Sequence, residues 1–366
     1  MRHFDRMSYT RTAFVIAGML VASQVSASAD THVVRPGESI QAAVDAASPG
    51  DTIVVKSGTY RESVRIQTSG ITLKAHGRVT IRPPTSGSDD CYLPDHDVGI
   101  CIAPADPGTG TYVARVRDVT ITGFRLVGFQ GEGIFGFHTR NLKVSNVVAI
   151  DNSAYGIASF DGIGTSFTHS AVTGSNDAGL YIGDSLEADA VVSHNRVWNN
   201  AFGILSRHAR KVVISDNDAW GNCLGIFLLA DGQAGGSGET AVLNNRVVAN
   251  KNVCTQFDQA GFLPVLGGGG IVLAGSQHNA IFQNVVRDNA VRDDQGDPIF
   301  TGGIVLVATP RENEDGSNDA STNNVVILNN LRGNEPADIV KDEASTPNLI
   351  LANRCRTSLP DGFCGD

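Results

Sequence analysis

The sequence has few aromatic residues and few charges, which make up only 6% and 18% of its 366 residues. After an N-terminal segment, no apolar run approaches the length needed to cross a bilayer, which argues against a membrane-spanning protein. Few aromatic side chains among many Val, Ile, Asn and Gly residues suit short stacked strands better than packed helices. The composition therefore favours a strand-rich protein without a membrane span.

Several motifs of familiar catalytic and metal sites are also missing. The chain has no C-x-x-C pair, no H-E-x-x-H and no G-x-S-x-G. A G-x-G-x-x-G match at 131–136 has no βαβ context, and the glycine run at 267–270 lacks a following Lys-Ser or Lys-Thr. We therefore do not expect a zinc protease helix, a serine-hydrolase elbow or a phosphate-binding loop.

Residues 1–29 have the pattern of a secretory signal peptide. They contain a basic start, an apolar centre and a small-residue cleavage site, at Arg2, Arg6 and Arg11, Ala13–Ala22 and Ala27–Ala29. The apolar centre of about ten residues is too short to span a bilayer. The pattern predicts a secreted, extracellular protein. We expect the mature chain, 30–366, to form a single domain.

The mature chain lacks positive charge. Removal of the signal takes away three Arg and one Asp, which leaves 25 basic and 37 acidic residues and a net charge of −12. This balance disfavours nucleic acid and anionic membranes as partners. It leaves open an anionic polysaccharide, which a local basic strip or bound calcium would hold.

Six cysteines in an exported chain predict disulfide bonds. Fifteen pairings exist, and proximity in sequence favours Cys91–Cys101, Cys223–Cys254 and Cys355–Cys364. The last of these would fasten the C-terminal tail.

A Gly-Ile or Gly-Leu dipeptide that comes a few residues after a stretch rich in Asn and Val recurs seven times, at Gly133, Gly156, Gly179, Gly203, Gly225, Gly270 and Gly303. The steps are 23, 23, 24, 22, 45 and 33 residues. A period near 23 suits one turn of a β-solenoid, in which each turn adds about 4.8 Å and equivalent residues stack in columns. Residues 39–47 have one apolar face, begin at Ser39 and are followed by Pro-Gly, which predicts a short helix capping the solenoid.

The stretch GESIQAAVDAASPGDTIVVKSGTY (37–60) and the repeats HNRVWNNAFGI (194–204) and DNDAWGNCLGI (216–226) resemble the pectin-lyase-like right-handed parallel β-helix superfamily. The resemblance implies an all-β fold of roughly ten turns with an N-terminal capping helix. Relatives include lyases, hydrolases, epimerases and proteins with no known chemistry, so the fold does not name an activity. The Asn-Thr-Asp, Gly-His-Gly and Arg-Ile-Lys motifs of polygalacturonases are absent, which argues against pectin hydrolysis.

Pairs of Asn five residues apart mark the corners of successive repeats, where Asn tolerates a left-handed backbone and forms side-chain ladders. Insertions interrupt the period at about 84–112, 231–240, 251–268, 291–302 and 309–322. We expect these insertions to be surface loops that wall a groove, because function concentrates on long loops of rigid scaffolds.

The position five residues after the repeat glycine carries four titratable side chains in consecutive turns: His138, Asp161, Asp184 and His208. Stacking would bring Asp161 and Asp184 to about 5 Å of each other, where two carboxylates repel and one pKa rises. We predict a coupled catalytic pair with the two histidines as proton carriers or ligands. The alternative is that these polar residues close the strand and satisfy the turn backbone.

Outward positions beside this column carry aromatic side chains that form either a sugar-stacking platform or a surface covered by loops. We assign Phe135, Phe137, Phe160, Tyr181 and Phe227 to substrate binding. Arg207 precedes His208 and would act as base or uronate clamp, with a solvated turn as the alternative.

Two function classes remain open from the sequence. One is a polysaccharide-active lyase, epimerase or hydrolase; the other is a non-catalytic extracellular module that binds glycan or protein. No cofactor is certain, and calcium stays open, with Asp95-His96-Asp97 and the acidic stretch 312–319 as oxygen-rich candidates. We expect a monomer with a glycan partner.

Overall fold

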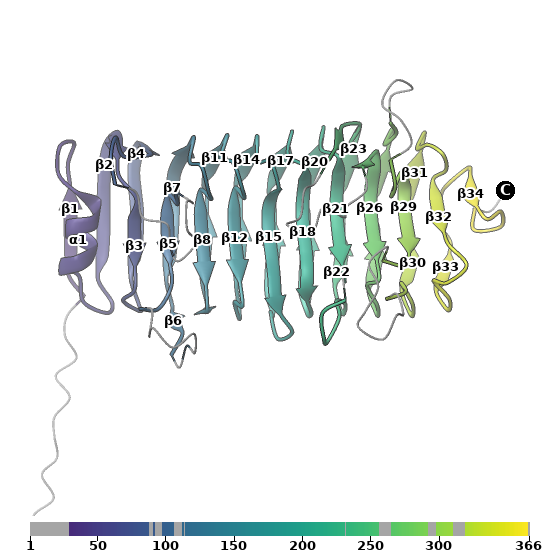
Figure 1. Cartoon of the computed structure of the whole chain (residues 1–366), viewed down its shortest axis with the longest axis horizontal. Coiled ribbons are helices and arrows are strands. Elements are labelled where there is room, and N and C mark those ends of the chain that lie inside the picture. The colour runs from purple at the N-terminus through teal and green to yellow at the C-terminus, as the bar shows by residue number, and fades with distance from the viewer. Residues whose placement is uncertain are drawn as a thin grey trace, which may run out of the picture.

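The computed structural model describes residues 29–87, 91, 97–105, 112, 114–230, 232–255, 265–291, 298–309 and 319–364. These residues form a parallel β-helix whose turns stack along one long axis, as the sequence predicts (Figure 1). The signal-like segment falls, except for Ala29, outside the described residues.

Each regular turn contributes one short strand to an 11-stranded sheet, which faces the viewer in Figure 1. Its neighbours pair in parallel, and the repeat glycines lie at or just before the start of its central strands. In order the sheet contains β3 (Val64–Ile66), β5 (Ile100–Ile102), β8 (Ile134–Phe137), β12 (Ile157–Phe160), β15 (Ala178–Ser185), β18 (Phe202–Ala209), β21 (Leu224–Leu229), β26 (Gly269–Ala274), β29 (Gly302–Val307), β32 (Ile339–Lys341) and β34 (Ser358–Leu359).

The rest of each turn belongs to a 19-stranded sheet made of two parallel runs. The lower run contains β1 (Thr31–Val34), β2 (Thr52–Arg61), β4 (Thr72–Arg82), β7 (Thr120–Val127), β10 (Lys143–Ser145), β13 (Ser166–Thr168), β16 (Ala190–Ser193), β19 (Val212–Ser215), β22 (Ala241–Leu243), β27 (Ala280–Phe282), β30 (Val325–Ile327) and β33 (Leu349–Leu351). The upper run, at the top of Figure 1, contains β11 (Val148–Ile150), β14 (Ala171–Thr173), β17 (Arg196–Trp198), β20 (Asp218–Trp220), β23 (Arg246–Val248), β28 (Val285–Arg287) and β31 (Asn330–Arg332). The long strands β4 and β7 pair with each other, and β7 then pairs both with β10 of the lower run and with β11 of the upper run. Through β7 the two runs belong to one sheet.

The core forms because the middle residue of each three-residue strand points inward and meets the same position of the next turn. One such column runs through Val144, Phe167, Val192, Ile214, Val242, Ile281 and Val326, all fully buried. Pairs of short strands outside the main sheets complete the fold: β6 (Val116–Arg117) with β9 (Thr139–Arg140), and β24 (Val253–Cys254) with β25 (Leu266–Gly267).

The predicted capping helix is α1 (Ile40–Ala46), at the N-terminal end of the solenoid. The Ser39 hydroxyl accepts a hydrogen bond from the Ala42 amide at 3.1 Å, which satisfies one of the free amides at the helix start. Ile40 and Val44 are buried against the first turns, so the helix shields the end of the core.

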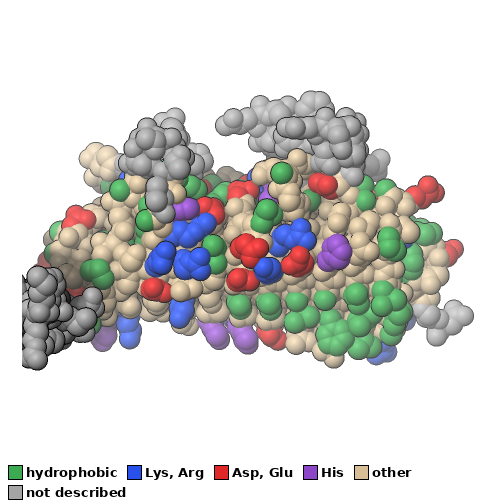
Figure 2. Space-filling view, turned by 90° about the horizontal axis from the view of Figure 1, so that it is seen from below, with side chains coloured by type: hydrophobic (Ala, Val, Ile, Leu, Met, Phe, Trp, Pro, Cys, Tyr) green, Lys and Arg blue, Asp and Glu red, His purple; other side chains and the backbone are tan. Residues whose placement is uncertain are grey.

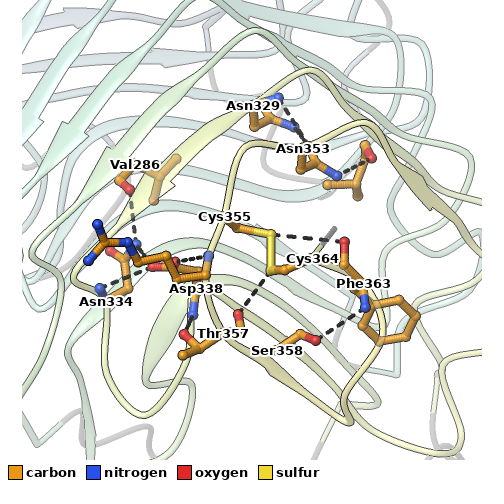
Figure 3. Close-up of a disulfide and its surroundings, with 12 residues drawn as sticks. Val286, Asn329, Asn334, Asp338, Asn353, Cys355, Thr357, Ser358, Phe363 and Cys364 are labelled. Carbon is orange, nitrogen blue, oxygen red and sulfur yellow. Dashed lines mark hydrogen bonds between the residues drawn. A yellow bond between two sulfur atoms is a disulfide. The ribbon is translucent and has the colours of Figure 1, made fainter. Parts of the chain in front are cut away.

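The asparagines five residues apart form the predicted ladders inside two corners. They do not themselves adopt the left-handed backbone expected of them, which belongs instead to the residue before each one, such as His194, Asn199 and Asp216. Each side-chain oxygen accepts from the backbone and side-chain amides of the preceding turn, at 2.8–3.2 Å. The ladders run through Asn195, Asn217, Asn245, Asn284, Asn329 and Asn353, and through Asn200, Asn222, Asn250, Asn289 and Asn334. Asp338 ends the second ladder by accepting from Asn334 at 2.8 Å (Figure 3).

All three predicted disulfides are present: Cys91–Cys101, Cys223–Cys254 and Cys355–Cys364. The last one holds the C-terminal tail beside Thr357 and Ser358 (Figure 3). Much of the five predicted insertions lies outside the described residues; in the third, β24 and β25 form an antiparallel pair.

Mass spectrometry of the mature protein should detect three disulfides and no free thiol. The Cys223–Cys254 bond closes a loop across 31 residues, so changing both cysteines to Ala should lower the free energy of unfolding by about 2–4 kcal/mol, because the unfolded chain regains freedom. The same double change at Cys355 and Cys364, which spans only 9 residues at the terminus, serves as control and should cost less. Two free thiols in the secreted protein would contradict the prediction.

The outward side of the lower run is apolar toward the C-terminal end, where green side chains gather at the lower right of Figure 2. Leu328, Leu349 and Leu351 are each about half exposed there, at 51%, 51% and 46%. Within the described part of the chain, no helix has the length and apolar character needed to span a membrane.

Candidate functional site

The four titratable residues five positions after the repeat glycine all lie at one corner of the solenoid. His138, Asp161, Asp184 and His208 have φ between 47° and 52°, in the left-handed region. Asp, Asn and His are enriched there among residues other than Gly. The left-handed backbone of the corner therefore explains why Asp and His occur at these positions, whether or not they also take part in catalysis.

The corner side chains contact different partners. The Asp161 carboxylate lies 2.6 Å from His138 Nδ1 and 2.7 Å from an Arg115 terminal nitrogen, so two cationic or hydrogen-bonding groups hold it. Asp184 is exposed and accepts a long hydrogen bond of 3.4 Å from the Tyr181 hydroxyl. His208 is only 2% exposed. The structure thus brings His138 to Asp161 and Asp184 to Tyr181, while coupling between the two carboxylates stays a prediction.

The aromatic residues assigned to substrate binding differ in exposure. Phe135, Tyr181 and Phe227 point away from the main core but are at most 4% exposed, in a second apolar cluster on the outside of the 11-stranded sheet. Phe137 and Phe160 pack at the margin of this cluster and keep partly exposed rings. Of the five, only these two offer surface to a sugar.

Tyr181 adopts an unusual position because of the glycine two residues later. A Cβ atom at Gly183 would lie 2.1 Å from the Tyr181 hydroxyl, so any other residue there would displace the phenol. The ring therefore lies over its own strand and stacks on Phe160 at 4.4 Å. Gly183 is the register partner of Arg207 on β18, and Arg207 donates a hydrogen bond to the Tyr181 hydroxyl.

A second tyrosine joins this group from the preceding turn. Tyr155 lies 4.8 Å from Tyr181 between ring centroids, and its hydroxyl is hydrogen bonded to the Asp177 carboxylate. Burial raises the pKa of Asp177 to about 6, although the Tyr155 hydrogen bond and the Arg207 charge both lower it. Burial also raises the pKa of both tyrosines well above the usual value, so both phenols are neutral proton donors.

Glu132 completes the polar group one turn before Tyr155. It is 1% exposed, and burial, aided by the nearby charge of Asp177, raises its pKa to about 7. We call Glu132, Tyr155, Asp177, Tyr181 and Arg207 the tyrosine–arginine site. It places one guanidinium beside two phenols and two carboxyl groups that change protonation near neutral pH, a combination typical of active sites.

The sequence reasoning included Tyr181 and Arg207 but missed the other three residues. Glu132 and Tyr155 directly precede repeat glycines, and Asp177 lies two residues before Gly179. The sequence prediction covers only positions that follow each repeat glycine, so it does not include these three residues. Two features of the sequence would have indicated the site. Titratable residues precede the repeat glycine in three successive turns, and Gly183 occupies a position, four residues after the repeat glycine, where the other turns carry a side chain.

The pKa of Glu132 predicts how stability depends on pH. The folded state binds its proton more tightly than the unfolded state, so the free energy of unfolding falls as pH rises from about 4.5 to about 7, by about 3 kcal/mol. Urea unfolding at about pH 5 and about pH 8 should show the lower midpoint at the higher pH. Glu132→Gln keeps the shape without the titration and should flatten this dependence; an unchanged slope in that variant would contradict the assignment.

No group of three or more His, Cys, Asp or Glu side chains able to hold a metal ion occurs within the described ranges. The calcium candidates fall largely outside them: 95 and 96 in the first, and 312–318 in the second. Of their described residues, Asp319 accepts a hydrogen bond from the Gly232 amide at 3.4 Å.

Several solved structures are similar to this chain over most of its length. The A-module of mannuronan C-5 epimerase AlgE6 from Azotobacter vinelandii has a TM-score of 0.61 and 19% identity, covering 86% of this chain and 88% of the module. DFA-IIIase from Arthrobacter chlorophenolicus A6 in complex with GF2 has a TM-score of 0.54 and 14% identity, covering 83% and 84%. The periplasmic alginate epimerase AlgG has a TM-score of 0.50 and 15% identity, covering 88% and 82%.

At these identities the likeness establishes the fold alone. A sequence comparison with curated proteins found no significant match. The family model described as a right handed beta helix region matches residues 132–331, more than half of the chain. The stacked parallel strands, the Asn ladders and this match agree, and the chain belongs to the right-handed β-helix family.

Proposed function

We propose that the protein is a secreted enzyme that acts on a polyuronate, a polysaccharide with a carboxylate on each sugar, at the tyrosine–arginine site. The observation that carries the proposal is Arg207, placed on the outside of the sheet against the Tyr181 hydroxyl and within the electrostatic influence of Asp177. A partly exposed guanidinium in this position is suited to bind a carboxylate through two parallel hydrogen bonds.

The reaction we propose is removal of the proton next to the sugar carboxylate, at C5. Pairing of the uronate with Arg207 withdraws charge and makes the C5 proton more acidic. Asp177, with a pKa of about 6, is ionised at neutral pH and takes this proton. Tyr155, already hydrogen bonded to Asp177, supplies a proton from its hydroxyl.

Two outcomes share this first step. In an epimerase, a proton returns to the opposite face of C5 and the configuration inverts. In a lyase, the electron pair from C5 forms the C4–C5 double bond as the C4–O bond breaks, and Tyr155 protonates the leaving oxygen. The proton on Asp177 then passes to Tyr155 along their hydrogen bond, which restores the starting state.

The structural neighbours are compatible with this proposal. Two of them are by name epimerases of mannuronan and alginate, although each is less than 20% identical to this chain. Three disulfides and the signal-like N-terminus support secretion, since disulfides persist in oxidising compartments.

A panel of polymannuronate, polygalacturonate and neutral polysaccharides tests the reaction class. Lyase activity would produce unsaturated sugars that absorb in the ultraviolet, whereas epimerase activity would exchange C5 hydrogen for solvent deuterium without cleavage. A hydrolase would release reducing ends without either signal and would contradict C5 proton removal.

Tyr155→Phe removes only the hydroxyl that bonds Asp177 and should lower kcat on the active polymer at least about a hundredfold. Tyr60→Phe is the matched control, because its hydroxyl donates to the Lys56 carbonyl oxygen in an early turn and should leave kcat unchanged. Full activity of Tyr155→Phe would exclude Tyr155 as the proton donor.

A non-catalytic binding module is the second candidate. It is favoured by the burial of Phe135, Tyr181 and Phe227 and by the Asp161 contacts with His138 and Arg115, which make parts of the predicted column structural. Polyuronate binding without exchange, cleavage or hydrolysis would support this candidate over the enzyme.

A further inference from the structure

A strip of basic side chains lies on the upper run, a different sheet from the one that holds the tyrosine–arginine site. Outward positions of β17, β23, β28 and β31 and of the chain that follows β33 carry arginines. We call them the arginine strip: Arg196, Arg246, Arg287, Arg332, Arg354 and Arg356. Two tryptophans, Trp198 and Trp220, lie at its N-terminal end.

The pairing of the strands aligns these residues in rows along the solenoid. One row follows the register Trp198, Trp220, Val248, Arg287 and Arg332. Successive members are separated by one strand spacing of about 4.8 Å, so this row extends for roughly 19 Å. A second row contains Arg196, Asp218 and Arg246, and Arg354 is bridged to Asn330 farther along.

Two shallow depressions occur along the strip. Arg196, Asp218, Trp220 and Arg246 line the first. Arg287, Arg332, Arg354 and Arg356 line the second, next to the C-terminal disulfide. The strip is therefore an extended, furrowed surface whose length matches several sugar units of a polymer.

The charges of the strip are largely uncompensated. Within the described residues, the only ion pair of these six guanidinium groups joins Arg246 to Asp218, at 3.6 Å between exposed side chains. Asp288 lies at the corner beside β28, where its amide donates to the Arg332 carbonyl oxygen. Five arginines thus have no carboxylate partner among the residues that the structure describes, on a protein whose net charge is −10.

The strip also offers many donors and few acceptors. Guanidinium and indole groups donate hydrogen bonds but do not accept them. The two indole rings are stacked at 5.1 Å with an angle of 2°. A partner that fits this surface must be elongated, negatively charged and rich in acceptor oxygens.

We propose that the arginine strip is a second binding surface for an anionic polysaccharide, specifically a polyuronate, separate from the tyrosine–arginine site. Carboxylates of the polymer pair with the arginines, and its sugar rings and hydroxyls contact the tryptophans. The choice of a polyuronate rests on the proposed function, whereas the existence of the strip does not.

A polyuronate fits better than a nucleic acid. Duplex DNA carries one negative charge per about 1.7 Å, so the acidic remainder of the protein would repel it more strongly than it would repel a polyuronate. A polyuronate carries a single charge per sugar, a spacing closer to that of the strands. A neutral polysaccharide would leave the guanidinium charges without partners.

The chain contains only two tryptophans, and both lie at the strip. Intrinsic tryptophan fluorescence therefore reports on this surface and not on the tyrosine–arginine site. Titration of the whole protein with polymannuronate or polygalacturonate should change the emission and protect both indoles from acrylamide quenching. The effect should weaken at least about tenfold in apparent affinity when salt rises from about 0.05 to about 0.5 M.

A charge-matched pair of variants tests the arginines. The first triple variant removes three exposed charges from the strip and should weaken binding at least about tenfold; it combines Arg246→Gln, Arg332→Gln and Arg354→Gln. Arg117→Gln with Arg140→Gln and Lys143→Gln removes three exposed charges elsewhere and should change binding less than about twofold. Equal weakening in both triple variants would overturn the proposal.

Three further measurements, with Arg207→Ala, with dextran and with duplex DNA, complete the test. Arg207→Ala should keep the full fluorescence response, which separates failure of the strip from failure of the proposed catalytic site. Dextran of matched length should give no response. An unchanged emission with both polyuronates, an equal response to dextran, or tighter binding of duplex DNA than of polyuronate would each overturn the proposal.

Discussion

Arg207→Ala is expected to reduce kcat/KM on the active polyuronate at least about a hundredfold, because it removes the group that binds the sugar carboxylate and stabilises developing charge. Arg207→Lys keeps one positive charge but loses the two parallel hydrogen bonds, so an intermediate loss is expected. Steady-state kinetics with the polymer identified by the panel measures both variants.

The same change should move the pH profile. The Arg207 charge lowers the pKa of Asp177, so its removal should raise that pKa and shift the acid limb of kcat/KM to higher pH. Arg210→Ala is the matched control: Arg210 pairs with Glu239 at 2.8 Å on the neighbouring corner, and its loss should leave the profile in place. Equal losses in the two variants would indicate a general structural effect.

The sequence was sufficient to predict the fold because the repeat has a strict physical cause. Each turn must bury the same inward positions and fill the same tight corners, so the constraint appears repeatedly as Gly-Ile, as Asn pairs and as alternating Val. The helix 39–47, the ladders and the three disulfides all depend on local spacing, and all three predictions are confirmed.

The candidate site was predicted only in part, because it depends on contacts across turns that spacing does not reveal. Spacing placed His138 near Asp161, but it did not predict that Arg115, 46 residues earlier, contacts the same carboxylate. It also did not predict that Tyr181 lies over Gly183 and reaches Arg207. Side-chain direction, not register, decides which columns meet.

The sequence also did not predict which of the outward side chains are exposed to solvent. The outward column through Phe135, Tyr181 and Phe227 has the composition expected of a binding platform, and the same composition suits a covered apolar cluster. Only the burial of these rings distinguishes the two. The charge balance of the sequence is compatible with a local basic strip. The position of the arginine strip became evident only from the register in which its strands pair, namely β17, β20, β23, β28 and β31.

Asn222→Ala is expected to lower the free energy of unfolding by about 3–5 kcal/mol, a large effect for a residue that contacts no substrate. The Asn222 side chain is fully buried, and its oxygen accepts from the Asn200 backbone and side-chain amides at 3.0 and 3.2 Å. Its amide donates to Asn250 Oδ1 at 2.9 Å and to the Val197 carbonyl oxygen at 3.2 Å. Alanine would leave the Asn200 amides and the Val197 carbonyl oxygen on the preceding turn without their partners, and Asn250 Oδ1 on the following turn would lose one of its two donors.

Urea unfolding followed by circular dichroism measures this effect, with Asn252→Ala as the control. Asn252 is exposed and its amide donates a single hydrogen bond, to the Gly221 carbonyl oxygen, so its loss should cost less than about 1 kcal/mol. Because each rung of the ladder contacts the rungs on either side, the cost at Asn222 should also exceed that of Asn353→Ala at the C-terminal end of the first ladder. Similar costs at all three positions would mean that the corners are held by backbone pairing alone and that the amide ladder contributes little to stability.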